Sequence, residues 1–282
     1  MEIVHSLYAL VVIYNMSCLD SQTCQALSGL ESENLHIIIY DNSLIDYGNR
    51  DSCRKMGWTY LGGAGNEGIS KAYNRCVEYL LKEGAQGHVC FFDQDSSPDE
   101  AYFLALDREI STFGQGIYAP FLYSANRLMS PCLLSENHRT ELLKDESAVL
   151  SAERNRLGAV NSCMAVSLEL FREYRYDEKI FLDGVDHCFL LDMRRRGHYL
   201  RVIPCRCEHG FSGDEKPPLE SAAVRFGIYA RDYRYIFRDN RKNYVYLVGK
   251  RMLSLTASYR SLRFFKIWMQ VKKSEGETHG EA

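Results

Sequence analysis

Short apolar runs recur along the N-terminal part of the chain and alternate with segments whose apolar residues follow a helical period. The runs contain few polar positions, which is typical of strands that are buried on both faces. The predicted strands lie at 7–14, 35–40, 58–61 and 88–92. The predicted helices end near residue 29 and extend over 66–82 and 98–113. Because strands and helices alternate at short intervals, the pattern predicts an α/β fold with a mostly parallel central sheet flanked by helices.

The alternation weakens after residue 123 and returns near residue 158. Further strands are predicted at 116–123, 158–166 and 199–203, with a helix that ends at Arg196-Gly197. Residues 124–157 are polar, and so long a segment is either a functional flap or an embellishment of the fold. From 216 to 273 the pattern is helical, aromatic and basic. We therefore expect an α/β domain over 1–215, a helical extension over 216–273 and a flexible tail over 274–282.

Polar and acidic side chains follow the predicted strands directly. Asn15 follows the first strand, Asp41 follows the second, and Asp93 and Asp95 follow the strand at 88–92. Open α/β sheets bind their ligands at the edge formed by the carboxyl ends of parallel strands. An Asp-x-Asp pair at that edge is a natural site for a hard divalent cation, which takes its remaining ligands from water and substrate phosphates. The alternative is that the two carboxylates cap a turn before the helix at 98–113, which Ser97 would begin as its N-cap.

A glycine-rich stretch precedes the helix predicted at 66–82. Asn66, Ser70 and Asn74 are four residues apart, so they share one polar face of that helix. Gly68 would allow a ligand to approach the first turn closely, and a helix N-terminus after such a loop can receive an anion. The spacing matches neither the dinucleotide fingerprint nor the P-loop. A capped amphipathic helix is the simpler alternative.

Composition and cysteine content indicate the class of protein and the compartment in which it is found. The chain has 282 residues, of which 46% are hydrophobic and 25% charged, as in ordinary globular proteins. Its ten cysteines are scattered without a Cys-x-x-Cys motif, which indicates reduced thiols in the cytoplasm. The apolar run at 7–14 lacks the basic flank and cleavage site of a secretion signal. No apolar run reaches the length that spans a bilayer.

The charge is unevenly distributed. Residues 225–273 contain 13 Lys or Arg against two acids, Asp232 and Asp239, so this segment carries +11 and the rest of the chain −14. Aromatic residues interleave with these cations, as they do in helices that lie at a membrane interface. We therefore expect peripheral contact with an anionic membrane surface, with a solvated helical pair as the alternative. The acidic remainder of the chain and the lack of a known binding module disfavour a nucleic-acid partner.

The order and spacing of these motifs resemble the inverting family 2 glycosyltransferases of GT-A fold, and most closely the bacterial dTDP-rhamnosyltransferases. The resemblance covers about residues 7–245. It is carried by Val11-Val12-Ile13-Tyr14-Asn15, Asp41-Asn42-Ser43, Gly65-Asn66-Glu67-Gly68 with Asn74, Asp93-Gln94-Asp95-Ser96, Phe181-Leu182-Asp183-Gly184-Val185-Asp186, His209 and Tyr235-Ile236-Phe237-Arg238-Asp239-Asn240. It implies that residues 1–215 form the catalytic domain.

The resemblance also implies site residues. Those expected to bind the nucleotide-sugar donor are Asn15, Asp41, Asn66, Gly68, Asn74 and Asp93. Asp41 would contact the nucleobase, while Asp95 and His209 would hold a Mg²⁺ or Mn²⁺ ion at the donor diphosphate. Asp186 would be the general base that deprotonates the acceptor hydroxyl, and Asp183 is the competing candidate or an acceptor ligand. Many family members have Glu-Asp where this chain has Val185-Asp186, in agreement with the rhamnosyltransferase branch.

The implied function is transfer of L-rhamnose from dTDP-rhamnose to a lipid-diphosphate-linked glycan in bacterial surface polysaccharide (O-antigen or capsule) synthesis. The implied location is the cytoplasmic face of the inner membrane. A hexosyltransferase that uses UDP-galactose or UDP-glucose is one alternative. A non-catalytic nucleotide-sugar-binding or scaffold protein of the same pathway is another. A nucleotidyltransferase is disfavoured, because residues 15–18 do not form a glycine-rich phosphate loop after the first strand.

Overall fold

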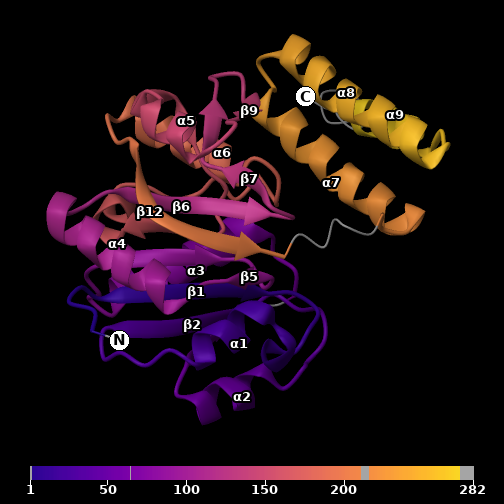
Figure 1. Cartoon of the computed structure of the whole chain (residues 1–282). Coiled ribbons are helices and arrows are strands. Elements are labelled where there is room, and N and C mark those ends of the chain that lie inside the picture. Colours follow the sequence, from indigo (N-terminus) through magenta and orange to yellow (C-terminus); the bar gives the residue numbers. More distant parts are fainter. Residues whose placement is uncertain (1, 64, 211–215, 274–282) are drawn as a thin grey trace. The chain divides into compact units, whose positions relative to one another are not determined.

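The computed structural model describes residues 2–63, 65–210 and 216–273 (Figure 1). The side chains of His209 and Lys273 and the predicted tail at 274–282 lie outside the described residues. The chain divides into two compact units. The first unit comprises Met1–Tyr176 and Asp186–Ser212, and the second comprises Asp177–Val185 and Gly213–Ala282.

The first unit is built on a central sheet with the strand order β3-β2-β1-β4-β11-β6-β12-β5, and β7 pairs with β6 outside this path. Its strands are β1 (Leu7–Ile13), β2 (Leu35–Asp41), β3 (Thr59–Gly62), β4 (His88–Phe92), β5 (Ser96–Ser97), β6 (Ile117–Ser124), β7 (Arg127–Ser130), β11 (Met164–Ser167) and β12 (Leu200–His209). A smaller sheet has the order β10-β8-β9 and consists of β8 (Cys132–Leu134), β9 (Thr140–Leu142) and β10 (Leu157–Gly158). The predicted α/β class is confirmed.

Strands β3, β2, β1 and β4 run parallel, so their carboxyl ends meet at one edge of the sheet. Strand β11 lies antiparallel between β4 and β6, whereas β12 runs parallel to β6. The sheet is thus mixed beyond β4. The reason lies in the segment from residue 124 to 158, which forms β7, the small sheet and the short helix α5 (Glu146–Ser151) instead of a helical crossover on a sheet face. Only such a crossover would force the next strand to enter parallel.

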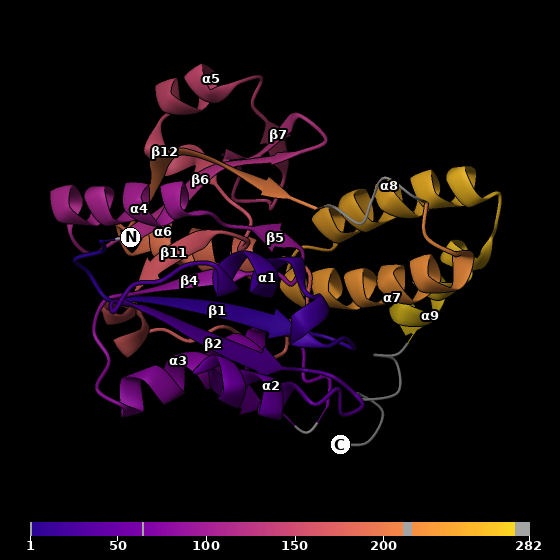
Figure 2. The same ribbon diagram turned by 60° about the horizontal axis from the view of Figure 1, so that its bottom comes forward.

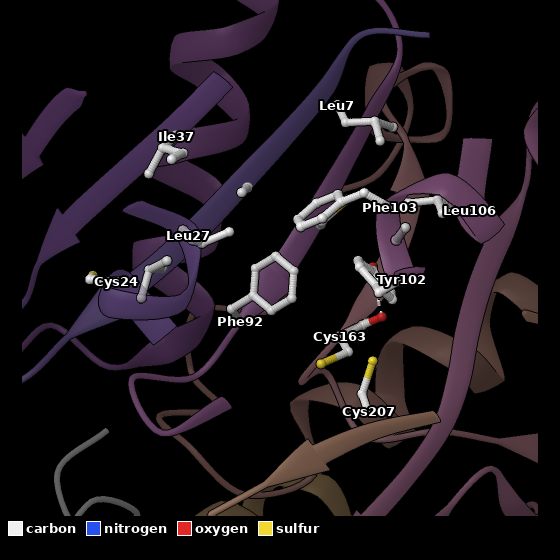
Figure 3. Close-up of a cluster of buried hydrophobic side chains, with 14 of the residues drawn as sticks. Leu7, Cys24, Leu27, Ile37, Phe92, Tyr102, Phe103, Leu106, Cys163 and Cys207 are labelled. Atoms are coloured by element: carbon white, nitrogen blue, oxygen red, sulfur yellow. Dashed lines mark hydrogen bonds between the residues drawn. The ribbon is translucent and has the colours of Figure 1, made fainter. Parts of the chain in front are cut away.

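Helices cover both faces of the sheet in the first unit (Figure 2). They are α1 (Gln22–Ser28), α2 (Asn49–Met56), α3 (Ile69–Lys82), α4 (Glu100–Phe113), α5 (Glu146–Ser151) and α6 (Val185–Arg195), with the short 3-10 helices η1 (Cys18–Asp20), η2 (Arg154–Arg156) and η3 (Leu168–Arg172). One face packs Leu7 and Phe92 against Leu27 of α1 and Tyr102 of α4 (Figure 3). On the other face, Tyr73 of α3 contacts Phe91 with ring centroids 4.5 Å apart. The alternation of side chains along β4 assigns Phe91 and Phe92 to opposite layers.

Two helices begin later than their sequence pattern predicts. Helix α3 begins at Ile69 because Gly68 adopts a φ of 83°, outside the helical region. Helix α4 begins at Glu100, and its N-cap is Asp99, whose side chain accepts a hydrogen bond from Tyr102 N at 2.9 Å. Ser97 is not the cap, because Ser96 and Ser97 form the strand β5 that pairs with the end of β12.

The second unit contains α7 (Leu219–Ile236), α8 (Arg241–Tyr259) and α9 (Arg263–Lys273), which pack against one another (Figure 1). Their shared core is aromatic and includes Phe226, Tyr233 and Phe264. In the part of the chain that the structure describes, no helix combines the length and apolarity needed to cross a bilayer.

Candidate functional site

The loops that follow β1, β2 and β4 are bonded to one another at the carboxyl edge of the sheet. The side-chain carbonyl of Gln94 accepts a hydrogen bond from Tyr14 N at 2.9 Å. Asn15 N donates to Ser43 Oγ at 2.9 Å, and Asn15 Oδ1 accepts from Leu44 N at 3.0 Å. Asn15 has a φ of 52°, a left-handed conformation that Asn tolerates better than most residues. Three loops that are distant in sequence are therefore fixed as one rim.

The loop that carries Asp93 and Asp95 is held by the start of α1. Thr23 is fully buried, and its hydroxyl lies 2.5 Å from Asp93 O, 3.0 Å from Ser96 O and 2.8 Å from Ser96 N. Ser21 Oγ donates to Gln94 O at 2.8 Å. The backbone of the loop is thus satisfied by hydroxyl groups of α1, while both Asp side chains stay half-buried at the rim.

Asp41 lies in a pocket of about 420 Å³ between β2, β3 and α2. The residue is 7% exposed, and its carboxylate accepts hydrogen bonds from Ser43 N at 3.1 Å and Asn49 Nδ2 at 2.9 Å. Tyr60 contributes a ring to the same pocket, and the guanidinium carbon of Arg50 lies 4.9 Å from the centre of that ring. The pocket therefore offers an acceptor and an aromatic face, which is the combination that a planar heterocycle needs.

Asn66 and Gly68 organise the loop that precedes α3. Asn66 Oδ1 accepts from Gly68 N at 3.2 Å and from Asn42 Nδ2 at 3.1 Å, which ties this loop to the end of β2. Asn74 has a different environment, because it is 2% exposed and its amide bonds both Tyr176 O and Tyr176 N at 2.9 Å. The expected polar face of α3 is therefore buried at Asn74, where its amide holds the backbone of Tyr176.

The same loop is anchored by a charged network. Glu67 Oε2 accepts from Tyr40 OH at 2.8 Å, and Glu67 Oε1 lies 2.7 Å from Lys71 Nζ. The hydrogen bonds from Lys71 and Tyr40 lower the pKa of Glu67, so its carboxylate stays ionised. A Cβ atom at Gly63 would lie 2.5 Å from Glu67 Oε2 and 2.8 Å from Tyr40 OH, so a larger residue there would have to displace these two side chains.

The Asp93-Gln94-Asp95 loop is suited to share a divalent cation with a bound diphosphate. Within residues 2–63, 65–210 and 216–273, no three or more His, Cys, Asp and Glu side chains form a closed metal site. Two carboxylates with outer positions left to water and phosphates are the usual donor set for Mg²⁺. The end of β12 adjoins this loop, because His209 pairs with Ser96 and Gly210 N donates to Asp95 O at 2.9 Å. The predicted metal contact of His209 concerns a side chain outside the described residues.

Asp186 lies in the first turn of α6 and is half-buried. Its Oδ1 accepts a hydrogen bond from His187 N at 2.8 Å. Burial, followed by the charges of Asp93 and Asp186, raises the pKa of the Tyr73 hydroxyl well above its ordinary value. The charges of Asp93, from the predicted donor site, and of Asp186, the predicted general base, thus both raise the pKa of one buried hydroxyl of α3.

Asp183 belongs to the second unit, where its carboxylate is already engaged. Arg225 donates to both of its oxygens, and the distance from Nη2 to Oδ1 is 2.8 Å. The backbone around Asp183 is held by Asp232, which is 3% exposed and accepts from Phe181 N at 3.0 Å and from Leu182 N and Asp183 N at 2.8 Å. Burial raises the pKa of Asp232, and these three backbone N–H groups oppose that shift.

Several of these residues were missed by the sequence analysis. Ser21 and Thr23 read only as the start of a helix, and nothing in the sequence links them to a loop about seventy residues later. Asp232 carried a usable signal, since it lies three residues after the buried Tyr229 and one before the buried Tyr233. An acid on the apolar face of a helix must find hydrogen-bond partners. Tyr60 carried no signal beyond its place in a short strand.

The sequence matches no known family model and no curated protein sequence. The structure resembles GalNAc-T7 in complex with UDP, GalNAc and Mn²⁺, with a TM-score of 0.58 at 14% identity over 96% of this chain and 58% of that one. It resembles the mannosyltransferase PcManGT from Pyrobaculum calidifontis in complex with GDP-Man and Mn²⁺, with a TM-score of 0.56 at 12% identity over 99% of this chain and 76% of that one.

Staphylococcus aureus TarS gives a TM-score of 0.51 at 14% identity over 81% of this chain. The chain spans 40% of the length of that TarS chain and 58% of the GalNAc-T7 chain. The curled mixed sheet with helices on both faces matches the architecture of these structures, and the chain has the GT-A glycosyltransferase fold.

Proposed function

We propose that the chain is an inverting glycosyltransferase that transfers a sugar from a nucleoside-diphosphate donor to an acceptor hydroxyl. The observation that supports this most is the shared rim, where the Asp41 pocket and the Asp93-Gln94-Asp95 loop are bonded into one edge of the sheet. The first would take the nucleobase, with Asp41 facing its polar edge and Tyr60 its ring. The second would take the diphosphate.

In the proposed reaction, the acceptor oxygen attacks the anomeric carbon from the face opposite the leaving group. The bond between that carbon and the diphosphate oxygen breaks, and the nucleoside diphosphate departs with both bonding electrons. Asp186 accepts the proton of the acceptor hydroxyl, a transfer worth about 10² to 10⁴ in rate. A divalent ion held by Asp95 and the donor diphosphate would supply charge stabilisation for the leaving group. Asp93 orients the ribose or the sugar.

The donor we propose is dTDP-rhamnose, and the acceptor is a lipid-diphosphate-linked glycan of a bacterial surface polysaccharide. This preference rests on the resemblance of the Asp93–Ser96 tetrad and the 235–240 segment. Ser96 is fully buried and its hydroxyl lies 2.5 Å from Ser162 Oγ, so it would act on the sugar only through the shape of the loop. We propose a peripheral location at the cytoplasmic face of the inner membrane, with the basic 225–273 segment toward anionic lipid.

A donor panel tests the proposal. Purified protein is given a divalent ion, a lipid-diphosphate glycan and dTDP-rhamnose, UDP-galactose or UDP-glucose in turn, and release of nucleoside diphosphate is measured. Turnover with dTDP-rhamnose alone supports the full proposal, and turnover with a UDP-sugar alone replaces the donor. Binding of a nucleotide sugar without turnover on any donor would support a scaffold protein instead.

Two substitutions test the assigned roles. Asp95→Ala should abolish metal-dependent donor binding. Asp186→Asn should leave donor binding intact and reduce turnover by about 10² or more. The matched control is Asp192→Asn, because Asp192 lies on the same helix in an exposed ion pair with Arg195 and should leave turnover unchanged. Near-normal turnover of Asp186→Asn would show that the base is another group, with Asp183 as the next candidate.

A further inference from the structure

A basic pocket of about 310 Å³ lies within the second unit, formed by the end of α7, the start of α8 and the end of α9. Its cations are Arg234, Arg238, Arg241 and Lys272, and its aromatic lining residues are Phe237 and Tyr244. The volume is at the lower end of the range that small-molecule sites occupy. It is separate from the donor pocket at Asp41, which belongs to the first unit.

The positive charge of this pocket is not balanced by its lining. Among the described residues that line it, none is acidic. The carboxylate of Asp239 lies 3.8 Å from Arg238 Nε, but its side chain is 94% exposed. An ion pair so open to water contributes little. At least Arg238, Arg241 and Lys272 therefore bring positive charge to one small cavity whose described lining contains no acid, and a ligand of opposite charge would relieve their repulsion.

Arg238 and Lys272 are oriented by neutral groups, and Arg234 joins two helices. Arg234 Nη1 donates to Val271 O at 2.5 Å, which joins α7 to α9. The Arg238 guanidinium carbon lies 4.6 Å from the centre of the Tyr235 ring, and Nη1 donates to Tyr235 O at 3.1 Å. Lys272 Nζ lies 3.6 Å from the centre of the Trp268 ring. Carbonyl oxygens and ring faces orient a cation without neutralising it, so the pocket is organised before any ligand arrives.

We propose that this pocket binds a phosphate or diphosphate group. Guanidinium groups present parallel N–H donors that match phosphate oxygens in pairs, and three of the four cations are arginines. The N-terminus of α8, at Arg241, adds the positive end of a helix dipole on the same side. The phosphate comes either from a lipid, as a phospholipid headgroup or the acceptor diphosphate, or from a soluble compound. The acceptor as the source rests on the proposed function, whereas the pocket itself does not.

The test is titration of the full chain with inorganic pyrophosphate by calorimetry at low salt. A chelator is present, so that the metal-dependent donor site does not contribute. The pocket variant is R238Q/R241Q, in which both altered side chains are exposed. The matched control is K242Q/K250Q, which removes the same charge from exposed positions of α8 outside the pocket. We expect one-to-one binding that weakens by at least about tenfold in the pocket variant and by less than about threefold in the control.

Equal weakening in both variants would overturn the proposal, because it would mean diffuse attraction to net charge. Absence of pyrophosphate binding to the unaltered chain would also overturn it. Sedimentation with phosphatidylcholine vesicles, with and without phosphatidylglycerol, then separates the sources. If the chain binds the anionic vesicles, and if both added pyrophosphate and the R238Q/R241Q substitution abolish that binding, the pocket binds lipid phosphate. If the chain binds pyrophosphate but not the vesicles, the pocket binds soluble phosphates. Turnover measured in parallel with a soluble glycan acceptor reports on the proposed function separately.

Discussion

Replacing Thr23 with valine removes one hydroxyl and tests whether α1 positions the Asp93-Gln94-Asp95 loop. Valine has nearly the same shape, so the packing of this fully buried residue is retained. The hydroxyl lies within hydrogen-bond distance of Asp93 O, Ser96 O and Ser96 N. Because one hydroxyl has one proton, it donates to one carbonyl at a time and accepts from Ser96 N.

The substitution leaves the Ser96 N–H and a carbonyl without this partner in a dry environment. Each such orphaned group costs about 1–3 kcal/mol, so Thr23→Val should lower the free energy of unfolding by about 2–6 kcal/mol. If the loop instead shifts to reach water, Asp93 and Asp95 move with it. Displacement of a binding group by about 1 Å is enough to weaken function by two orders of magnitude, and we expect metal-dependent donor binding to fall by at least about tenfold.

Urea unfolding gives the stability, and calorimetric titration of a nucleoside diphosphate with Mn²⁺ gives the binding. The control is Thr112→Val, since the Thr112 hydroxyl also donates to one backbone carbonyl, Arg108 O at 2.9 Å, but on the exposed face of α4. Its effect should stay within about 0.5 kcal/mol. Equal, small effects of the two substitutions would refute the hydrogen-bond account. A destabilised Thr23→Val that binds donor normally would refute the positioning role.

Two further predictions concern buried ionisable groups. Asp232→Asn replaces one acceptor oxygen by an NH₂ group that faces the backbone N–H groups of residues 181–183, so it should lower unfolding stability by about 2 kcal/mol. The control is Asp239→Asn. The Asp239 side chain, which follows α7, is 94% exposed, so this substitution should leave the midpoint of urea unfolding unchanged. Burial lowers the pKa of His88 from 6.5 to about 4. The unfolded chain therefore binds the proton first, and stability is lost as pH falls from 6.5 to 4, by up to about 3 kcal/mol. In His88→Phe, the free energy of unfolding measured with urea should therefore change less between pH 6.5 and pH 4. If its pH dependence in that window stays the same as in the unaltered chain, His88 is not the group responsible.

The elements that could be predicted are those specified by local patterns. The strand at 88–92 and the strand that ends at Asp41 have uninterrupted apolar runs, and their ends place Asp93 and Asp41 at one edge by topology alone. The direction of β11 could not be predicted, because it depends on β7 and on the small sheet formed within 124–158, whose strands have only two to four residues. Short polar strands carry too few side chains to show a period.

The contacts that hold the site could not be predicted for a different reason. A hydroxyl that bonds a backbone carbonyl of another loop has no sequence partner with a recognisable side chain. Thr23 is such a case, because it bonds only backbone atoms of residues 93 and 96. Those carbonyl and N–H groups would be present whichever residues stood at these two positions. Most side-chain hydrogen bonds in proteins go to backbone or water. The predictable part of the rim is therefore the set of side chains that would meet a ligand, and the unpredictable part is the set that holds the backbone.

This distinction bears on which carboxylate takes the proton. The resemblance assigned the general base to Asp186, with Asp183, three residues earlier, as the competing candidate. Asp183 is held by two bonds from Arg225, and it would have to leave that pair before accepting a proton from a sugar hydroxyl. Asp186 accepts a bond from the adjacent His187 N, which leaves its second oxygen available to an acceptor. The ion pair with Arg225 is thus a physical reason to propose Asp186, and not Asp183, as the general base.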